Sequence, residues 1–265
     1  MGQPSTLASA EPRCDDFWTR NRLDLKGQGQ VEDMATEFSQ SEPEVEKQLR
    51  SKLLCYHEAG HAVLMWNLGF EVDRVFVDRA RLSGHVLPTL ERPESHSVST
   101  RIARILYYLA GGVAHRCFQE GPDKTTMHPS IADIKYVLDI ISTLEDLPAG
   151  AEIYLLQIML VRTIQIVDTA EVQAQIHRLA SALQPHGCLF KRQVHLLLKG
   201  MSVSHRAIQL SRGAVAEIVS ELPTLLQNAK VVAPRVAKDP KYQQLAALPS
   251  DQCSHLHSDP QAPPE

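Results

Sequence analysis

The residues of this chain best suited to chemistry are two histidines and a glutamate that lie within one helical turn. His57, Glu58 and His61 belong to the run His-Glu-Ala-Gly-His. If this segment is helical, the two imidazoles lie on one face and can reach the same cation, while Glu58 is rotated by about 100° toward a water on that cation. Two neutral nitrogen ligands, an open coordination position and a proton-accepting carboxylate are the components of a zinc hydrolase. The pattern therefore predicts a Zn²⁺ site in which Glu58 acts as the general base.

Such a site needs a third protein ligand, and the local pattern leaves the choice open. The extended metzincin pattern would require glycine and histidine where the chain has Leu64 and Asn67, so that class is excluded. The downstream candidates are His85, His96, His115, Asp123, His128 and Asp133. Asp133 also has a purely structural explanation, because Ser130-Ile-Ala-Asp133 is a capping box at the start of a helix.

The elements that must position these residues are predicted to be mainly helical. Ser41 and Glu44 form a capping box, and apolar residues at helical spacing continue to Gly69, which predicts a helix of about 25 residues around the histidines. Alternating residues predict two short strands, at 72–77 and 82–87, joined as a hairpin. Further helices are expected from about residue 97, from about residue 130, and over about 150–166, 168–184, 190–199 and 203–229.

The composition favours a soluble, cytoplasmic protein. The chain has 265 residues and a formal net charge of −4, which gives no general electrostatic reason to bind nucleic acid. Its five cysteines are odd in number and form no Cys-x-x-Cys pair, which indicates reduced thiols rather than a disulfide framework. Neither a membrane span nor a secretory signal is expected, since no run of 18 apolar residues and no basic-then-apolar leader is present.

The order of motifs along the chain resembles the peptidase domain of FtsH-type zinc metalloproteases, the protease half of a membrane-anchored AAA enzyme. The matching segments are Tyr56-His-Glu-Ala-Gly-His-Ala-Val63, Gly84, Leu109-Ala-Gly-Gly-Val-Ala114 and Ser130-Ile-Ala-Asp-Ile-Lys135. The resemblance covers roughly residues 45–200 and implies a helical zincin-like metalloprotease domain with a small β element. In that family the aspartate of Asp-Ile-Lys is the third zinc ligand, and it corresponds to Asp133. The Gly111–Gly112 pair in the third segment also indicates close packing of its helix against a neighbour.

Departures from the family pattern bear on activity. The chain contains no Gly-x-x-x-x-Gly-Lys-Ser/Thr phosphate loop, so no AAA ATPase module is expected. The family's membrane anchor is not expected either, because no run of 18 apolar residues is present. The family's arginine corresponds to Val113, and its acidic pair corresponds to Arg116 and Cys117. Carboxylates at those positions would orient the ligands from outside the coordination sphere. Their replacement makes a zinc-binding relative without proteolysis, acting as a binding or regulatory module, the main alternative to a protease.

The expected organisation follows from these observations. It comprises a mobile N-terminal arm over 1–40, a zinc peptidase domain over 41–200, a C-terminal helix over 201–231 and a disordered tail over 232–265. Without an ATPase, the expected substrates are peptides or unfolded proteins, unless a separate ATPase unfoldase docks; a homo-oligomer is compatible with the sequence. Two further alternatives stay open: the two histidines face an ordinary core, or the helix at 203–229 recruits a protein partner.

Overall fold

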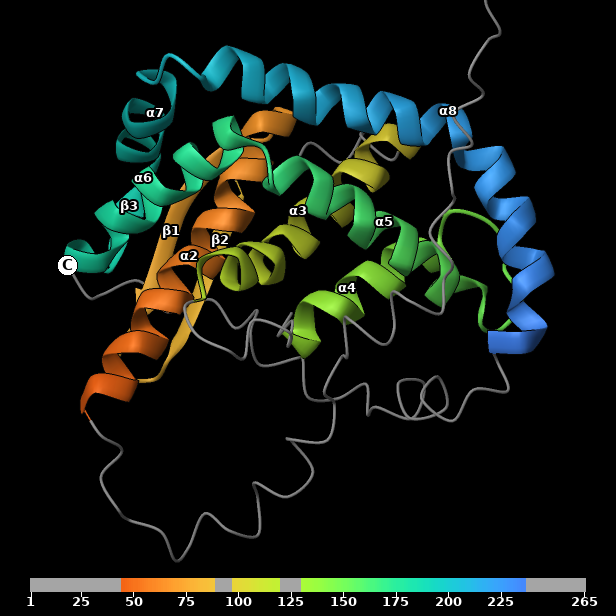
Figure 1. The fold of residues 1–265 in the computed structure, drawn as a ribbon, viewed down its shortest axis with the longest axis horizontal. Coiled ribbons are helices and arrows are strands. Elements are labelled where there is room, and N and C mark those ends of the chain that lie inside the picture. Colours follow the sequence, from red (N-terminus) through yellow and green to blue (C-terminus); the bar gives the residue numbers. More distant parts are fainter. Residues whose placement is uncertain (1–43, 89–96, 120–129, 237–265) are drawn as a thin grey trace, which may run out of the picture.

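A computed structural model describes residues 44–88, 97–119 and 130–236 and shows a mainly helical molecule with one small sheet (Figure 1). The helices are α2 (Glu44–Leu68), α3 (Val98–Phe118), α4 (Ile131–Ser142), α5 (Ala151–Val167), α6 (Ala170–His186), α7 (Lys191–Lys199) and α8 (Ser204–Val236). The strands are β1 (Val72–Asp78), β2 (Ser83–Pro88) and β3 (Cys188–Phe190). The expectation of a mainly α fold with a small β element is confirmed. The predicted arm over 1–40 and the predicted cap at Ser41 lie outside the described residues.

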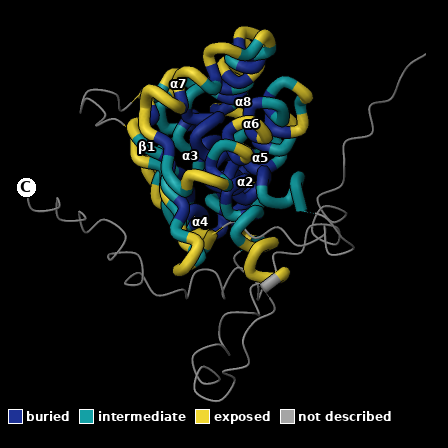
Figure 2. The backbone as a smooth tube through the Cα atoms, turned by 90° about the vertical axis from the view of Figure 1, so that its left-hand side faces the viewer, coloured by how far each residue is buried: buried dark blue, intermediate teal, exposed yellow. Residues whose placement is uncertain are grey.

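Helix α2 carries the His-Glu-His motif through the interior of the molecule. In Figure 2 its buried part lies among the other core helices. Its first two turns are exposed, whereas Ala59, Val63 and Leu64 are fully buried. The helix ends where the sequence predicts, at Gly69, which adopts a left-handed conformation with φ of 94°. The predicted rigid support for the histidines is therefore present.

Helix α3 lies unusually close to α2. A Cβ atom placed on Gly60 of α2 would fall 2.6 Å from both the carbonyl oxygen of Ala110 and the Cβ of Ala114 on α3. Real Cβ atoms do not approach other atoms so closely, so this contact requires a glycine. The close helix packing predicted from the Gly111–Gly112 pair is confirmed, and it brings the backbone of α3 against the metal-binding motif.

The sheet has the strand order β2-β1-β3, with both pairs antiparallel. The predicted β1–β2 hairpin is present. Its register is irregular between Val72 and Arg74, which allows Val72, Val75 and Val77 to share the buried face. Strand β3 was not predicted, because three residues are too few to show an alternating pattern. Strand β2 forms an edge of the sheet.

Helices α5 and α6 contribute large apolar side chains to the core. Leu155 and Met159 on α5, and Ile176 and Leu179 on α6, are fully buried. None of the described helices is by itself both long and apolar enough to cross a membrane. Taken together, α5 and α6 reach that length and composition, with a bend of 81° at their junction.

Helix α8 closes the same core rather than standing apart from it. Ala207, Ile218 and Ala229 are fully buried within the cluster that also contains the core residues of α2 and α3. In Figure 1 the helix runs along one side of the molecule and bends along its course. It continues to Val236, so the predicted boundary at residue 231 falls inside it. The rest of the predicted tail lies outside the described residues.

Candidate metal centre

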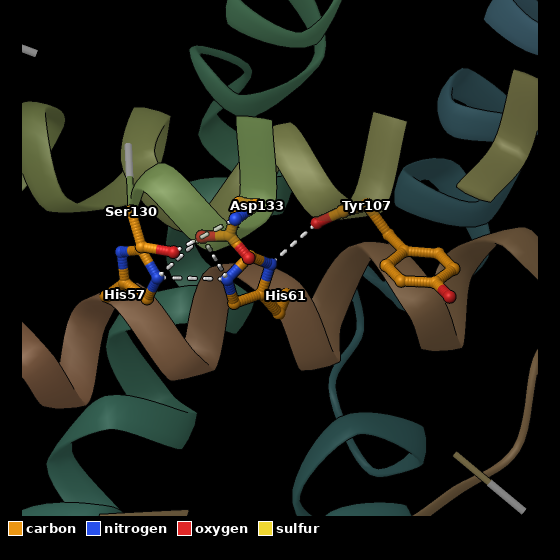
Figure 3. A network of polar contacts seen from close by, with 5 residues as sticks. All are labelled: His57, His61, Tyr107, Ser130 and Asp133. Carbon is orange, nitrogen blue, oxygen red and sulfur yellow. Dashed lines mark hydrogen bonds and ion pairs between the residues drawn. The ribbon is translucent and has the colours of Figure 1, made fainter. Parts of the chain in front are cut away.

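Three side chains from two helices converge on one point. His57 and His61 project from α2, and Asp133 projects from the first turn of α4 toward them (Figure 3). The Nε2 atoms of the two histidines are 3.0 Å apart, and the Asp133 Oδ2 atom lies 3.3 Å from the His57 Nε2 and 3.5 Å from the His61 Nε2. All three residues are buried. Of the candidates for a third ligand, the structure thus brings Asp133 into place.

This triangle has the dimensions and the chemistry of a metal site. A tetrahedral zinc ion with bonds of about 2.0–2.2 Å would hold its donor atoms roughly 3.3–3.5 Å apart, close to the observed separations. The Asp133 Oδ2 atom is buried and makes no hydrogen bond to the described residues. In the metal-free site its charge is met only by the two imidazole Nε2 atoms among the described residues, and a cation held by the same three atoms would satisfy this buried oxygen directly. The cluster is therefore able to hold a metal ion, which argues against two ordinary core histidines.

His61 is oriented by the backbone of α3. Its Nδ1 lies 2.8 Å from the Tyr107 carbonyl oxygen, which can only accept a hydrogen bond, so the Nδ1 atom carries the proton. The Nε2 atom then faces the ligand triangle, as metal binding requires. One turn further along α3, a Cβ at Gly111 would fall 2.2 Å from that same Nε2. Gly111 therefore provides the space that the imidazole occupies.

Asp133 combines a structural role with its position in the site. Its backbone N–H donates to the Ser130 Oγ at 3.1 Å, which is the predicted N-cap of α4. The side-chain carboxylate remains directed toward the histidines. A stacked pair of rings, Tyr136 on α4 and Tyr108 on α3, with centroids 5.2 Å apart, joins the two helices next to it. The N-cap of α4 uses only the backbone N–H of Asp133, so it coexists with the position of the carboxylate in the site.

The charges at the site are strongly coupled. Burial alone would raise the pKa of Asp133, but the adjacent His61 and His57 imidazoles hold that pKa well below its usual range. Burial would lower the pKa of His61, yet the Asp133 carboxylate, Glu58 and the bond to the Tyr107 carbonyl raise it to about 9. Before any metal binds, the site therefore carries an imidazolium–carboxylate pair at neutral pH.

Glu58 occupies the position expected of a general base rather than that of a ligand. It is 4% exposed and lies against strand β2, where a Cβ at Gly84 would fall 2.7 Å from its Oε1 atom. Burial raises the pKa of Glu58, and the nearby His57 and His61 offset this effect only in part. A carboxylate whose pKa is raised holds a proton more readily, which suits it to accept one and return it.

The remaining candidate ligands lie elsewhere or outside the described residues. His85 is on β2, next to Gly84; successive strand residues face opposite sides, so His85 faces away from Glu58 and its ring contacts Phe76 instead. The ring of His115 on α3 lies 6.4 Å from that of His57, beside the triangle. Three further candidates lie outside the described residues: His96, Asp123 and His128.

The positions that depart from the family pattern have ordinary structural environments. Val113 is buried in the core. The Cys117 Sγ donates to the Asp168 Oδ1 at 3.4 Å, and burial together with Asp168 raises the pKa of this thiol to about 12. At this position the chain therefore has an uncharged thiol where the resembled family has a carboxylate. The Nδ1 atom of His61 is held by the Tyr107 carbonyl and not by a carboxylate.

No protein-family model and no curated protein matches this chain. The geometry of the site and the order of motifs along the sequence are therefore the features that bear on its function. Sequence reasoning did not find the Tyr107 carbonyl, because every residue has a carbonyl and none is marked by residue type. The packing of Glu58 on Gly84 depends on how β2 approaches α2, which no local pattern specifies.

Proposed function

We propose that this protein is a zinc-dependent metallopeptidase of the FtsH type that hydrolyses peptide bonds in peptides or unfolded proteins without an ATPase module of its own. The observation that carries the proposal is the convergence of His57, His61 and Asp133 beside a buried glutamate with a raised pKa. A site that serves structure alone needs no such glutamate. The order of motifs around the site supports the same reading.

The ligands proposed for zinc are the His57 and His61 Nε2 atoms and the Asp133 carboxylate. When bound by these residues, zinc would supply Lewis-acid chemistry, which lowers the pKa of a water and polarises a carbonyl group. Glu58 accepts the proton of the attacking water and then delivers it to the leaving amine. The Tyr107 carbonyl fixes the His61 tautomer throughout, because its hydrogen bond keeps the proton on Nδ1.

Strand β2 is the proposed binding edge for an extended substrate. Its side away from β1 is not paired with another strand among the described residues. Gly84, the second residue of β2, lies against Glu58, so a peptide that adds to this edge would pass the proposed general base. Main-chain hydrogen bonds to an edge strand bind extended peptides with little dependence on their sequence. Flexible or unfolded chains fit such an edge, and a separate unfoldase would be needed to supply folded proteins.

The experiment compares the wild-type protein with Glu58→Gln and, as a control, Glu46→Gln, an exposed position on the same helix. Each protein is loaded with zinc, its metal content is measured, and cleavage of casein and of quenched fluorescent peptides is followed. We expect Glu58→Gln to retain one zinc ion and to lose at least about 100-fold in cleavage rate, because removing a general base has effects of that order. The Glu46→Gln control should cleave like the wild type. Undiminished cleavage by Glu58→Gln would refute the role assigned to Glu58.

A second candidate function is a zinc-binding module without turnover. The specific observation in its favour is the environment of Cys117, an uncharged thiol bonded to Asp168 where the resembled family has a carboxylate. In that case the wild type would bind zinc and cleave none of the substrates. The same experiment therefore separates the two functions.

A further inference from the structure

Helices α2 and α3 place two pairs of residues opposite one another at the metal centre. Gly111 lies against the His61 Nε2, and the His115 ring lies edge-on to the His57 ring, with centroids 6.4 Å apart and planes at 87°. A step of one turn forward on α2, from 57 to 61, thus matches a step of one turn backward on α3, from 115 to 111. The helices therefore run antiparallel in a fixed register, which holds His115 beside the ligands.

His115 does not belong to the ligand triangle. The three atoms that lie within 4.8 Å of one another come from His57, His61 and Asp133. The rings of the two ligand histidines are 4.6 Å apart, closer than the 6.4 Å between the rings of His57 and His115. His115 is half-buried, whereas the three ligands are buried, so it lies nearer the surface. This is a position from which a side chain can contact a molecule that enters the site.

We propose that His115 donates a hydrogen bond to the carbonyl oxygen of the bound substrate as negative charge develops on it. This inference rests on the proposed peptidase function. When the water oxygen bonds to the carbonyl carbon, the electron pair of the C=O double bond moves to the carbonyl oxygen, and Glu58 takes the proton of the water. The C–N bond then breaks, and that proton goes to the leaving nitrogen. His115 donates a hydrogen bond throughout and loses no proton.

An imidazole suits this role in either charge state, because the neutral ring also carries one N–H donor. A donor fixed in place before the reaction stabilises the developing charge without reorganisation, and removing one such donor costs about 100- to 1000-fold in rate. The competing assignment is a fourth metal ligand. His115 would then close the coordination position that the substrate needs.

The test uses the full chain loaded with Co²⁺, whose visible spectrum reports the ligand set, and a phosphinic peptide whose tetrahedral phosphorus imitates the attacked carbonyl. The variants are His115→Ala and His115→Gln, which restores an N–H donor. The control is His205→Ala, which alters an exposed histidine on α8. Cobalt affinity, the spectrum, the dissociation constant of the phosphinic peptide, and kcat and KM for a peptide substrate are measured for each.

We expect all four proteins to show the same cobalt affinity and spectrum. His115→Ala should bind the phosphinic peptide about 10- to 100-fold more weakly and lose kcat with little change in KM, and His115→Gln should recover part of both losses. Unchanged binding of the phosphinic peptide by His115→Ala overturns the inference, as does an altered cobalt spectrum, which would make His115 a ligand.

The binding measurement separates this inference from the proposed function. If the wild type binds cobalt and the phosphinic peptide but cleaves nothing, the peptidase proposal fails, while a loss of binding in His115→Ala still supports the donor contact. A wild-type protein that binds neither cobalt nor the phosphinic peptide overturns both the peptidase proposal and the role of His115.

Discussion

The position of Gly111 on α3 is fixed by the His61 imidazole, whose Nε2 atom occupies the space that any Cβ at residue 111 would fill. The glycine is therefore part of the candidate metal centre, although it offers no ligand atom. It allows a helix backbone to approach a ligand histidine closely enough for the Tyr107 carbonyl, one turn earlier, to hold the other ring nitrogen. The metal centre thus depends on backbone positions as much as on its ligands.

Replacing Gly111 by alanine should separate metal binding from helix stability. A Cβ at 2.2 Å from the Nε2 must displace the His61 ring, so we expect zinc affinity to fall by at least about 10-fold, the range seen when the groups that orient a ligand are lost. The matched control is Gly213→Ala on α8, where a Cβ would meet nothing within 4 Å. This change should raise the free energy of unfolding by about 1 kcal/mol, because alanine favours the helix more than glycine does. Zinc titration and thermal unfolding of both variants test this. Equal zinc affinity in Gly111→Ala and the wild type would contradict the packing described.

Replacing Asp133 by asparagine should weaken the site without undoing helix α4. The N-cap bond to Ser130 uses the backbone N–H of residue 133, so the helix start is retained, while the charged ligand is lost. We expect the zinc affinity to fall at least about 100-fold, because a neutral amide oxygen is a much weaker ligand for the divalent ion than a charged carboxylate. Asp139→Asn, an exposed position on the same helix, should bind zinc like the wild type. Competition with a chromophoric chelator measures both, and tight zinc binding by Asp133→Asn would remove Asp133 from the ligand set.

Zinc binding should release a proton from His61. In the metal-free protein the pKa of His61 is raised to about 9, so near pH 7 the imidazole carries a proton that a metal ion must displace. We expect release of about one proton per zinc ion near pH 7, declining as the pH rises through about 9, with zinc affinity increasing over the same range. Calorimetric titrations in buffers with different heats of ionisation measure the number of protons released per zinc ion. Zinc binding without proton release would show that His61 is neutral in the metal-free site.

The same raised pKa predicts how the stability of the metal-free protein depends on pH. The folded-state pKa of about 9 exceeds the ordinary value of 6.5. The stabilisation that His61 gains from Asp133 is therefore fully present below about pH 6.5 and is lost as the pH rises through about 9. Chelator-treated protein should accordingly lose stability toward alkaline pH. Urea unfolding of Asp133→Asn should show a weaker dependence over this range, and an identical dependence would disprove the assigned coupling.

Helix α8 should behave as core and not as a recruitment surface. Ile218 is fully buried, so Ile218→Ala should lower the free energy of unfolding by about 2–5 kcal/mol. Val231, on the same helix, is 68% exposed, and Val231→Ala should change the free energy of unfolding by no more than about 0.5 kcal/mol. Chemical denaturation of both variants measures the difference. A small effect at Ile218 would restore the alternative in which this helix recruits a partner.

Much of the fold could be predicted from periodicity and capping residues. Gly69 ended α2 and Ser130 began α4 where the sequence indicates, because a left-handed glycine and an N-cap serine act locally. The three-residue strand β3 and the end of α8 at Val236 could not be predicted. A pattern of three residues carries no periodicity, and α8 continues through Pro234, a residue that ordinarily ends a helix.

The sequence predicts the residues of the candidate site that share one helix better than those that the tertiary structure brings to it. His57, Glu58 and His61 are neighbours in sequence, so their spacing alone places them on one helix. Asp133 could be nominated only from the order of motifs, since no local rule brings α4 against α2. The proximity of His115 depends on the antiparallel register of α2 and α3, a tertiary property, and the sequence left it among several candidate ligands.

The residues of the candidate metal centre are also widely separated along the chain: Asp133 follows His61 by 72 positions (133 − 61 = 72). An ion bound to both is a reversible cross-link that closes a loop of this length, and long loops lose the most conformational entropy when they are closed. The loop contains β1, β2 and α3, the elements that hold Glu58, His61 and His115 in place. Loss of a bound ion would therefore allow α4 to open locally, and amide hydrogen exchange in α4 would report whether the site is filled.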